Sequence, residues 1–520
     1  MLSSGDQFSL CNLNHRLRYG KVCWTLFIFL LGASNGWTQL QLAKQFEDNM
    51  VLQRDRPIKV WGQAAPGSQI RVSFGNHAMD GVAAADSSWQ VVLPALPTST
   101  IPQSLQVVSG SECISRSNIL LGDVWVCIGQ SNMEWPLKKE MHFAQLSTSF
   151  SNPSLRFLNP MYAGKNIFGT TFTDSVVNNL NSQKFYQGEW QTCTYESARD
   201  MSAVAFYFAT TVLAATNVPI GLINLSIGGA PLETFIDRDV MAASEQFSSK
   251  VNSDWLLNSS LPVWVRQRGM QNLENVKKAP ADQLGVNHAY KPGFAFSAGI
   301  APLQHLPIAG ILCYQGESNA QEWDRVAEYG ALSTLLVASY RQQWSHPTLP
   351  FYFVQLSSID SIRYKSQLWP QFREEQRKML DSISFSGMAV SSDIGALHDV
   401  HPTNKKWVGE RLARWALHDH YKKSIVPSGP LPLAATYKGH NIVIRFQYAG
   451  RKLSICKGTA LKGFSIDGVN PVGATVRGKR KVIIHAKGAS TVYYGWKPYS
   501  DGNLINSEGL PASTFKMIVQ

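Results

Sequence analysis

The chain has 520 residues, of which 44% are apolar and 16% are charged, and its formal net charge is +12. Because one hydrophobic core rarely serves a chain of this length, we expect two or three globular domains. The basic residues are scattered and never form a run of five, which argues against nucleic acid as a partner. A mildly basic surface suits an anionic substrate but does not by itself indicate one.

The first 36 residues have the order of parts found in a secretory signal peptide. Basic residues between His15 and Lys21 precede an apolar run over 22–31, and small residues follow at 32–36. We predict cleavage near Gly36 and a secreted or lysosomal protein; retention of the segment as an anchor stays open. No later stretch of the sequence is long enough to span a bilayer, so we expect no stable membrane association after cleavage.

The cysteines and the N-glycosylation sequons bear on how a secreted chain would be modified. Five cysteines remain after removal of the signal, which does not indicate a disulfide framework. Of the two sequons, Asn224 lies in an apolar strand, whereas Asn258 lies in a polar loop and is the predicted glycosylation site. The five cysteines are Cys113, Cys127, Cys193, Cys313 and Cys456.

The predicted elements fall into three parts along the chain. Short strands with Pro and Gly turns over 39–115 indicate a small antiparallel β-sandwich. From residue 118 onward strands alternate with helices, which indicates an α/β domain with a mostly parallel sheet covered on both faces. Past Pro427 the pattern is again that of β-structure. The predicted strands of the middle part are 123–128, 220–225, 308–314, 351–356 and 388–392, and its helices are 202–214, 324–343 and 404–416.

A serine follows the first strand of the middle part without an intervening loop. Residues 123–128 are apolar and partly β-branched, and they run directly into Gly129-Gln-Ser-Asn132. Open α/β folds place reactive groups at the carboxyl ends of such strands, and Gly129 allows the sharp turn that would present Ser131. The alternative is that Ser131 caps the next helix. Alone, this pattern does not decide between nucleophile and cap.

Two further strands end in residues that suit the stabilisation of an oxyanion. The strand at 220–225 leads into Gly228 and Gly229, whose backbone N–H groups can donate to developing charge; an ordinary glycine turn is the alternative. The strand at 308–314 leads into Gln-Gly-Glu-Ser-Asn at 315–319. The Gln315 amide could donate to an oxyanion, whereas an ionised Glu317 could only orient its neighbours. A capping box for the next helix would use similar residues.

Histidines and an aspartate precede the last predicted helix. Residues 398–401 read His-Asp-Val-His. A hydroxyl nucleophile needs a base within hydrogen-bond reach, and that base needs an acceptor to fix its tautomer. The alternative, two solvated loop histidines that cap the helix, is favoured for either histidine alone but not in combination with the earlier segments.

The motifs together resemble the sialate O-acetylesterase family of the SGNH hydrolase superfamily. They are Gly-Gln-Ser-Asn-Met at 129–133, the glycine pair at 228–229, Tyr-Gln-Gly-Glu-Ser-Asn at 314–319 and Val-His-Pro at 400–402. Further similar segments lie at 48–53, 219–223 and 355–358, so that the resemblance covers nearly the whole mature chain. It implies a flavodoxin-like, mostly parallel catalytic domain at 118–425, between a β-sandwich at 37–117 and a β-rich domain at 426–520.

The resemblance also implies a mechanism and the residues that carry it out. Ser131 would be the nucleophile and His401 the general base, with the backbone N–H groups of Ser131 and Gly229 and the Gln315 side chain as the oxyanion hole. No metal or organic cofactor is needed. Members of the superfamily usually have Asp three residues before the histidine, where this chain has His398. Asp399 is therefore the predicted orienting residue, and Asp393 is the alternative.

Substrate contacts and the choice of substrate are predicted more loosely. Asn132, Glu317 and Arg373 are candidate substrate-binding residues, and Arg373 could pair with the carboxylate of a sialic acid. The expected substrates are O-acetylated sialic acids or sialoglycans. An acetylesterase of other sugars or polysaccharides is the second hypothesis, and a non-catalytic glycan-binding protein is the third. The simultaneous presence of Ser131, Gly229 and His401 argues against the third.

Overall fold

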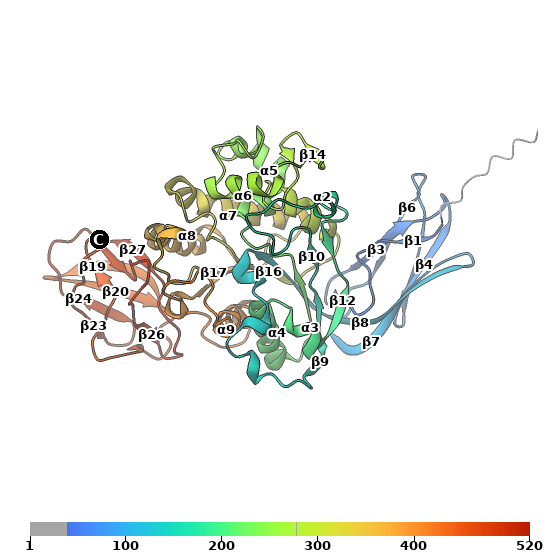
Figure 1. Cartoon of the computed structure of the whole chain (residues 1–520). Coiled ribbons are helices and arrows are strands. Elements are labelled where there is room, and N and C mark those ends of the chain that lie inside the picture. Colours follow the sequence, from blue (N-terminus) through green and yellow to red (C-terminus); the bar gives the residue numbers. More distant parts are fainter. Residues whose placement is uncertain (1–38, 277) are drawn as a thin grey trace, which may run out of the picture.

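The computed structural model describes residues 39–276 and 278–520, and the chain passes through three parts in sequence order (Figure 1). A β-rich part forms one end, an α/β part the middle, and a second β-rich part the other end. The predicted signal peptide at 1–36 lies outside the described residues. Within them, no helix is long and apolar enough to cross a membrane.

Two small sheets pack together in the first part. One has the order β1-β3-β6, and the other contains β5, β4, β7 and the first half of β8. Alternate residues of β4 and β6 are buried, the pattern expected of strands with one face on a core. The strands are β1 Gln41–Leu42, β2 Val51–Gln53, β3 Ile58–Gln63, β4 Gln69–Phe74, β5 His77–Val82, β6 Ser88–Leu93 and β7 Ser99–Ser109.

Strand β8, Glu112–Gly129, belongs to both the first part and the middle part. Its first half pairs antiparallel with β7, and its last seven residues pair parallel with strands of the central sheet. Burial changes with the pairing, since alternating exposure gives way to an unbroken buried run that begins at Ile119 and Leu120. The predicted boundary between residues 117 and 118 therefore falls inside a continuous strand.

The central sheet has the strand order β12-β9-β13-β8-β16-β17-β18, and every pairing except that of β12 with β9 is parallel. All five strands predicted here are present. Strand β9 was not predicted, because Pro153 and serines interrupt its apolar pattern. The strands are β9 Ser151–Leu158, β12 Trp190–Thr194, β13 Ile220–Asn224, β16 Gly310–Tyr314, β17 Phe351–Gln355 and β18 Ser386–Val390.

Two pairs of helices cover the sheet. Helix α4 packs on α9, and α7 packs on α8; Figure 1 shows the pairs on opposite sides of the strands. These helices confirm the mixed α/β architecture, and α8 is the one that the sequence pattern did not predict. Their bounds are α4 Ala203–Thr216, α7 Trp323–Gln343, α8 Trp369–Ser382 and α9 Lys406–Trp415. The other α-helices are α1 Ser131–Glu134, α2 Asp174–Asn178, α3 Tyr195–Arg199, α5 Arg238–Ala243 and α6 Val263–Leu273.

The last part is β-structure with an apolar core of its own, which includes Ile442, Ile444 and Phe515. One sheet has the order β19-β20-β24-β23, a second β22-β25-β27, and a third β21-β26. The strands are β19 Leu431–Lys438, β20 Asn441–Gln447, β21 Leu453–Ile455, β22 Phe464–Ser465, β23 Ala474–Arg477, β24 Lys481–Ile484, β25 Thr491–Tyr494, β26 Leu504–Asn506 and β27 Phe515–Ile518. Two-stranded pairs β10-β11 (Met161–Tyr162 with Tyr186–Gln187) and β14-β15 (Ala281–Asp282 with Gly285–Val286) lie earlier in the chain.

Candidate active site

The chain turns sharply between β8 and α1 because a glycine stands at the turn. Gly129 has φ +130°, and a Cβ at this position would lie 2.1 Å from the carbonyl oxygen of Tyr314. Only glycine fits such a conformation against a neighbouring strand. The backbone N–H of Gln130 then donates to the same Tyr314 oxygen at 3.0 Å. Ser131, the first residue of α1, is thereby held at the carboxyl edge of the sheet.

The structure brings together Ser131 and His401, which lie 270 positions apart in the sequence. Their Oγ and Nε2 atoms are 2.8 Å apart. The imidazole ring stacks on the indole of Trp135, with ring centroids 5.3 Å apart and planes at 22°. Hydrogen-bond contact between a hydroxyl and an imidazole nitrogen is the geometry that activates a serine nucleophile. The two residues predicted to perform the chemistry therefore meet.

Of the two candidate aspartates, only Asp399 lies beside His401. Its Oδ1 is 3.6 Å from Nδ1 of the imidazole, beyond ordinary hydrogen-bond length, and accepts the backbone N–H of His401 at 2.8 Å. Asp393 instead makes two bonds of 2.7 Å to the guanidinium of Arg411, so it is not free to orient the imidazole. His398 is exposed, and its Nδ1 lies 3.3 Å from the carbonyl oxygen of Asp360.

Two backbone N–H groups are free beside the serine. Gly229 has φ +76° and follows a segment held against the nucleophile turn, where the N–H of Ile227 donates to the carbonyl of Gly129 at 3.0 Å. Tyr290 Oη donates to the carbonyl of Gly228 at 2.7 Å. This bond fixes the orientation of the peptide group that contains both that carbonyl and the Gly229 N–H. Within 39–276 and 278–520, neither this N–H nor that of Ser131 has an acceptor. Unused N–H groups of this kind suit a developing oxyanion.

The predicted role of Gln315 as an oxyanion donor is wrong. Its Nε2 donates to Asn319 Oδ1 at 2.8 Å, the Ala230 carbonyl at 3.2 Å and Gln130 Oε1 at 3.3 Å, while its Oε1 accepts from Tyr329 at 2.7 Å. An amide nitrogen has two protons, and both are committed here. Gln315 therefore links the ends of β8, β13 and β16 and does not face the substrate.

Asn132 and Glu317, predicted to contact the substrate, are buried and occupied by other groups. Nδ2 of Asn132 donates to Glu317 Oε1 and to the carbonyl of Val400, and Oδ1 accepts from Nζ of Lys405. The two predicted contacts are therefore corrected: these side chains lie behind the nucleophile. Asn132 instead ties the residue after Ser131 to the residue before His401, so it fixes the distance between nucleophile and base.

Burial sets the protonation of this region. The pKa of His401 is lowered to about 4, first by burial and then by the positive charge of Lys405. The imidazole is therefore neutral near pH 7 and can accept the serine proton. Burial also raises the pKa of Glu317 to about 7 and lowers that of Lys405 to about 7. Such perturbed groups cluster at functional sites.

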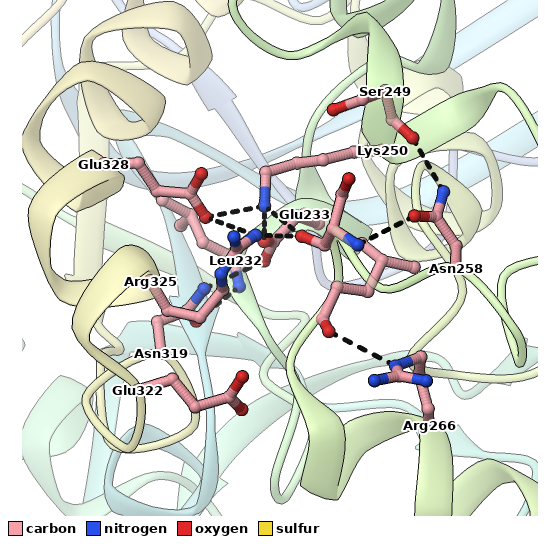
Figure 2. Close-up of polar contacts among 12 residues, drawn as sticks. Leu232, Glu233, Ser249, Lys250, Asn258, Arg266, Asn319, Glu322, Arg325 and Glu328 are labelled. Atoms are coloured by element: carbon pink, nitrogen blue, oxygen red, sulfur yellow. Dashed lines mark hydrogen bonds and ion pairs between the residues drawn. The ribbon is translucent and has the colours of Figure 1, made fainter.

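A second buried polar network supports the site from the side of the 240–290 segment (Figure 2). Lys250, 1% exposed, donates to Glu233 at 2.8 Å, to Glu328 at 2.7 Å and to the carbonyl of Ser260 at 2.9 Å. Glu233 in turn accepts from Asn319 Nδ2 at 2.9 Å, and Asn319 is the residue that Gln315 contacts. The network thus continues to the turn that carries the nucleophile.

The predicted glycosylation of Asn258 is contradicted by its place in the same region. The side chain is 6% exposed, and its Nδ2, the atom that would carry a glycan, donates to the carbonyl of Ser249 at 2.7 Å. Its Oδ1 accepts from the N–H of Ser260 at 2.9 Å. In Figure 2 these bonds hold the loop around Lys250. A sequon in a polar loop does not reveal that its asparagine side chain folds inward.

The predicted contact of Arg373 with a substrate carboxylate is also wrong. The guanidinium is fully buried and donates to backbone carbonyls of the last β-rich part, among them Pro498 at 3.2 Å and Gly495 at 3.1 Å. Arg373 therefore joins α8 to that part of the chain.

Among the described residues no group of His, Cys, Asp or Glu side chains could hold a metal ion, and the five cysteines are unpaired.

Sequence reasoning missed Lys405, Trp135 and Tyr290. Lys405 follows the predicted histidine by four residues, and a single lysine before a helix ordinarily indicates a solvated side chain. Trp135 and Tyr290 lie outside every motif. Only the aromatic character of the segment after Ser131 could have pointed to a ring beside the base.

Comparison with known proteins agrees with this geometry. Residues 297–418 match the family described as carbohydrate esterase, sialic acid-specific acetylesterase. The matched range contains the third and fourth motifs. The chain is 25% identical to sialate O-acetylesterase of Rattus norvegicus over 447 residues, with 78% of this chain and 79% of that protein covered. For the Homo sapiens enzyme the identity is 24% over 440 residues, with 78% and 76% covered.

A solved structure extends the similarity over nearly the whole chain. A carbohydrate acetylesterase from Xanthomonas citri superimposes with a TM-score of 0.73 and 29% identity, and the match covers 92% of this chain and 99% of that one. The resemblance recognised from the sequence motifs is confirmed. The chain is a hydrolase of ester bonds, related over most of its length to the sialate O-acetylesterases.

Proposed function

We propose that this protein removes O-acetyl groups from sialic acids by acyl transfer through Ser131. The observation that carries the proposal is the contact of 2.8 Å between Ser131 Oγ and His401 Nε2, next to the free N–H groups of Ser131 and Gly229. The relationship to sialate O-acetylesterases supports the choice of substrate.

The reaction follows from the positions of these groups. Ser131 Oγ attacks the acetyl carbonyl while its proton passes to Nε2 of His401, and the carbonyl oxygen becomes an oxyanion bound by the two N–H groups. Collapse of this intermediate breaks the bond to the sugar oxygen, which takes the proton from His401. Water then attacks the acetyl-serine with His401 again as the base, which releases acetate and restores Ser131.

The sheet topology supports the assignment to a flavodoxin-like SGNH hydrolase fold. If β9 is set aside, the parallel strands β8, β13, β16, β17 and β18 stand in the order 2-1-3-4-5. Folds with this order bind ligands at the carboxyl ends of the first and third strands, where the direction of winding changes. Those strands are β8 and β16, and Ser131 directly follows β8.

Localisation in the secretory or lysosomal route is part of the proposal and rests on the N-terminal sequence. Expression of the full chain in a eukaryotic secretory host, followed by N-terminal sequencing of protein from the medium, tests it. Recovery of a chain that begins near Trp37 would support cleavage of the signal. Protein found only inside the cell with Met1 retained would contradict it.

The activity is tested by acetate release from an O-acetylated sialic acid, with wild type beside Ser131→Ala and His401→Ala. We expect loss of about 10⁴-fold or more in kcat for either variant, as for other serine acyl-transfer enzymes. His398→Ala is the matched control, because this histidine is exposed and lies three residues from His401. Equal activity of wild type and Ser131→Ala would refute the role of the serine.

An acetylesterase of other acetylated sugars is the second candidate, favoured by one observation. The Xanthomonas citri protein, described as a carbohydrate acetylesterase, matches 92% of the chain. Acetate release from an acetylated neutral polysaccharide, but not from a sialic acid, would keep the mechanism and replace the substrate. A purely glycan-binding role has no use for the serine–histidine contact.

A further inference from the structure

An arginine without a carboxylate partner lies near the proposed oxyanion turn. Arg268 belongs to α6, in the segment between β13 and β16. Across the part of the chain that the structure describes, its guanidinium makes no hydrogen bond and no ion pair, and its Nε is buried without an acceptor. A partly buried charge without a counterion is costly in a resting protein and is common where a charged ligand binds.

Two aromatic rings hold this guanidinium in place. Its Cζ lies 5.7 Å from the ring centroid of Trp264, four residues earlier on the same face of α6, and 5.9 Å from that of Phe168. Contacts of a guanidinium with ring faces orient the group without using its N–H donors. The donors of Arg268 therefore stay available for a planar acceptor.

The same two rings cover the glycine pair beside Ser131. A Cβ on Gly229 would lie 2.9 Å from the Trp264 ring, and one on Gly228 would lie 3.4 Å from the Phe168 ring. The rings that position the guanidinium thus form one side of the turn that supplies the oxyanion N–H. A sugar whose acetyl group lies at this turn would have its ring next to Trp264 and Arg268.

Other cations near the site are less suited to bind an anion. Lys165 is paired with Glu134 at 3.2 Å, and Lys405 is completely buried behind Asn132. Lys139 is exposed and lies 5.6 Å from the ring of Trp135, on the side of His401. It is the competing candidate, but its flexible ammonium lacks the fixed, planar donors of an arginine.

We propose that Arg268 binds the carboxylate of the sialic acid and so determines the preference for this acidic sugar over neutral ones. The inference rests on the proposed function. A guanidinium and a carboxylate make two parallel N–H···O bonds, which fix the orientation of the sugar relative to Ser131. Arg268 takes over the role that the sequence alone suggested for Arg373.

The test compares an O-acetylated sialic acid with its methyl ester, which has the same sugar and acetyl group but no carboxylate charge. We expect wild type to prefer the acid, and Arg268→Met to lose about 10- to 100-fold in kcat/KM for the acid and little for the methyl ester. Hydrolysis of 4-nitrophenyl acetate measures the serine chemistry of each variant. Arg268→Lys keeps the charge, so its kcat/KM for the acid should lie between those of wild type and Arg268→Met. It replaces Arg268→Met in the test if that variant does not fold.

Two variants complete the design. Arg266→Met is the matched control on α6, because its guanidinium Nε donates to the carbonyl of Leu261 (Figure 2) and should not affect the discrimination. Lys139→Met tests the competing cation. Equal losses on acid and methyl ester in the Arg268 variants, or loss of discrimination in Lys139→Met alone, would overturn the inference and leave the proposed function intact. Failure of wild type to release acetate from either sialic acid substrate would instead refute the proposed function and, with it, the role of Arg268.

Discussion

Two lysines of this protein are buried to the same degree and have opposite surroundings. Lys250, 1% exposed, contacts the carboxylates of Glu233 and Glu328; we name these three residues the Lys250 cluster. Lys405, 0% exposed, donates to the amide oxygen of Asn132 and lies over the rings of Trp135 and Tyr314, with Glu317 on the other side of that amide. We name Lys405, Asn132 and Glu317 the Lys405 cluster. No carboxylate lies within ion-pair distance of Lys405 in residues 39–276 and 278–520.

The difference separates a supporting role from a chemical one. In the Lys250 cluster the ammonium holds the pKa of Glu233 below its usual value despite complete burial, whereas burial raises the pKa of Glu328. In the Lys405 cluster burial moves the pKa of both Lys405 and Glu317 to about 7. A group with such a pKa changes charge near physiological pH, and the Lys405 cluster lies next to Ser131 and His401.

The largest expected effect is on stability, in the Lys250 cluster. Lys250→Met leaves the fully buried carboxylate of Glu233 without its cation, while Glu328 keeps its ion pair of 2.8 Å with Arg325, so we expect the free energy of unfolding to fall by about 3–5 kcal/mol. Urea denaturation followed by circular dichroism measures it.

Addition of Glu233→Gln to that variant is the control, because an uncharged amide costs less to bury than a carboxylate. The double variant should regain part of the lost stability. A change below about 1 kcal/mol in Lys250→Met alone would show that the cluster does not depend on its cation.

The corresponding variant of the Lys405 cluster should cost less stability and change the pH dependence of catalysis. Lys405→Met leaves one amide oxygen without its donor, at a cost of about 1–3 kcal/mol. Because the charge of Lys405 helps to lower the pKa of His401, its removal should raise that pKa from about 4 toward 6.5. The acidic limb of the kcat/KM profile should then move to higher pH.

The sign of that shift follows from the protonation state that catalysis needs. His401 accepts a proton from Ser131 only when neutral, so wild-type kcat/KM should be constant above the pKa of about 4 and fall below it. The pKa of His401 is lower in the folded chain than in the unfolded chain. Its contribution to the free energy of unfolding therefore falls as the pH falls from 6.5 to about 4.

Lys139→Met is the matched control, since Lys139 also lies 5.6 Å from the Trp135 ring but is exposed. We expect it to move the acidic limb little, because solvent screens an exposed charge. If the acidic limb of the kcat/KM profile stayed at the same pH in Lys405→Met, the low pKa of His401 would be due to burial and not to the charge of Lys405.

How far the sequence predicted this site depends on what positions each residue. Ser131 and Gly229 follow apolar strands, and parallel strands end at one edge of a sheet, so their proximity could be inferred from local patterns. The side chains of Gln315 and Arg373 are positioned by neighbours far away in the chain, and their predicted roles were wrong. The inward orientation of Asn258 and the burial of Lys405 have the same origin, since contacts between distant segments decide which way a polar side chain points.

The smallest expected effect concerns the two aspartates, which repeat the contrast between a paired and an unpaired group. Asp393 is bound by Arg411 through two bonds of 2.7 Å, whereas Asp399 is 62% exposed on its side chain and lies 3.6 Å from the imidazole. Removal of a buried, hydrogen-bonded triad aspartate costs about 10⁴-fold in kcat. At this distance and exposure Asp399 should stabilise the imidazolium far less, so we expect Asp399→Asn to lower kcat by about tenfold.

Asp393→Asn should leave kcat of the folded enzyme unchanged and lower the free energy of unfolding by about 1–2 kcal/mol, since it breaks a charge-assisted pair. Kinetics at saturating substrate and urea denaturation of both variants separate the two effects. A loss near 10⁴-fold in Asp393→Asn alone would mean that this aspartate turns to the imidazole when substrate binds. Full activity of both variants would leave a serine–histidine dyad, in which stacking on Trp135 and the bond to Ser131 orient the base without an aspartate.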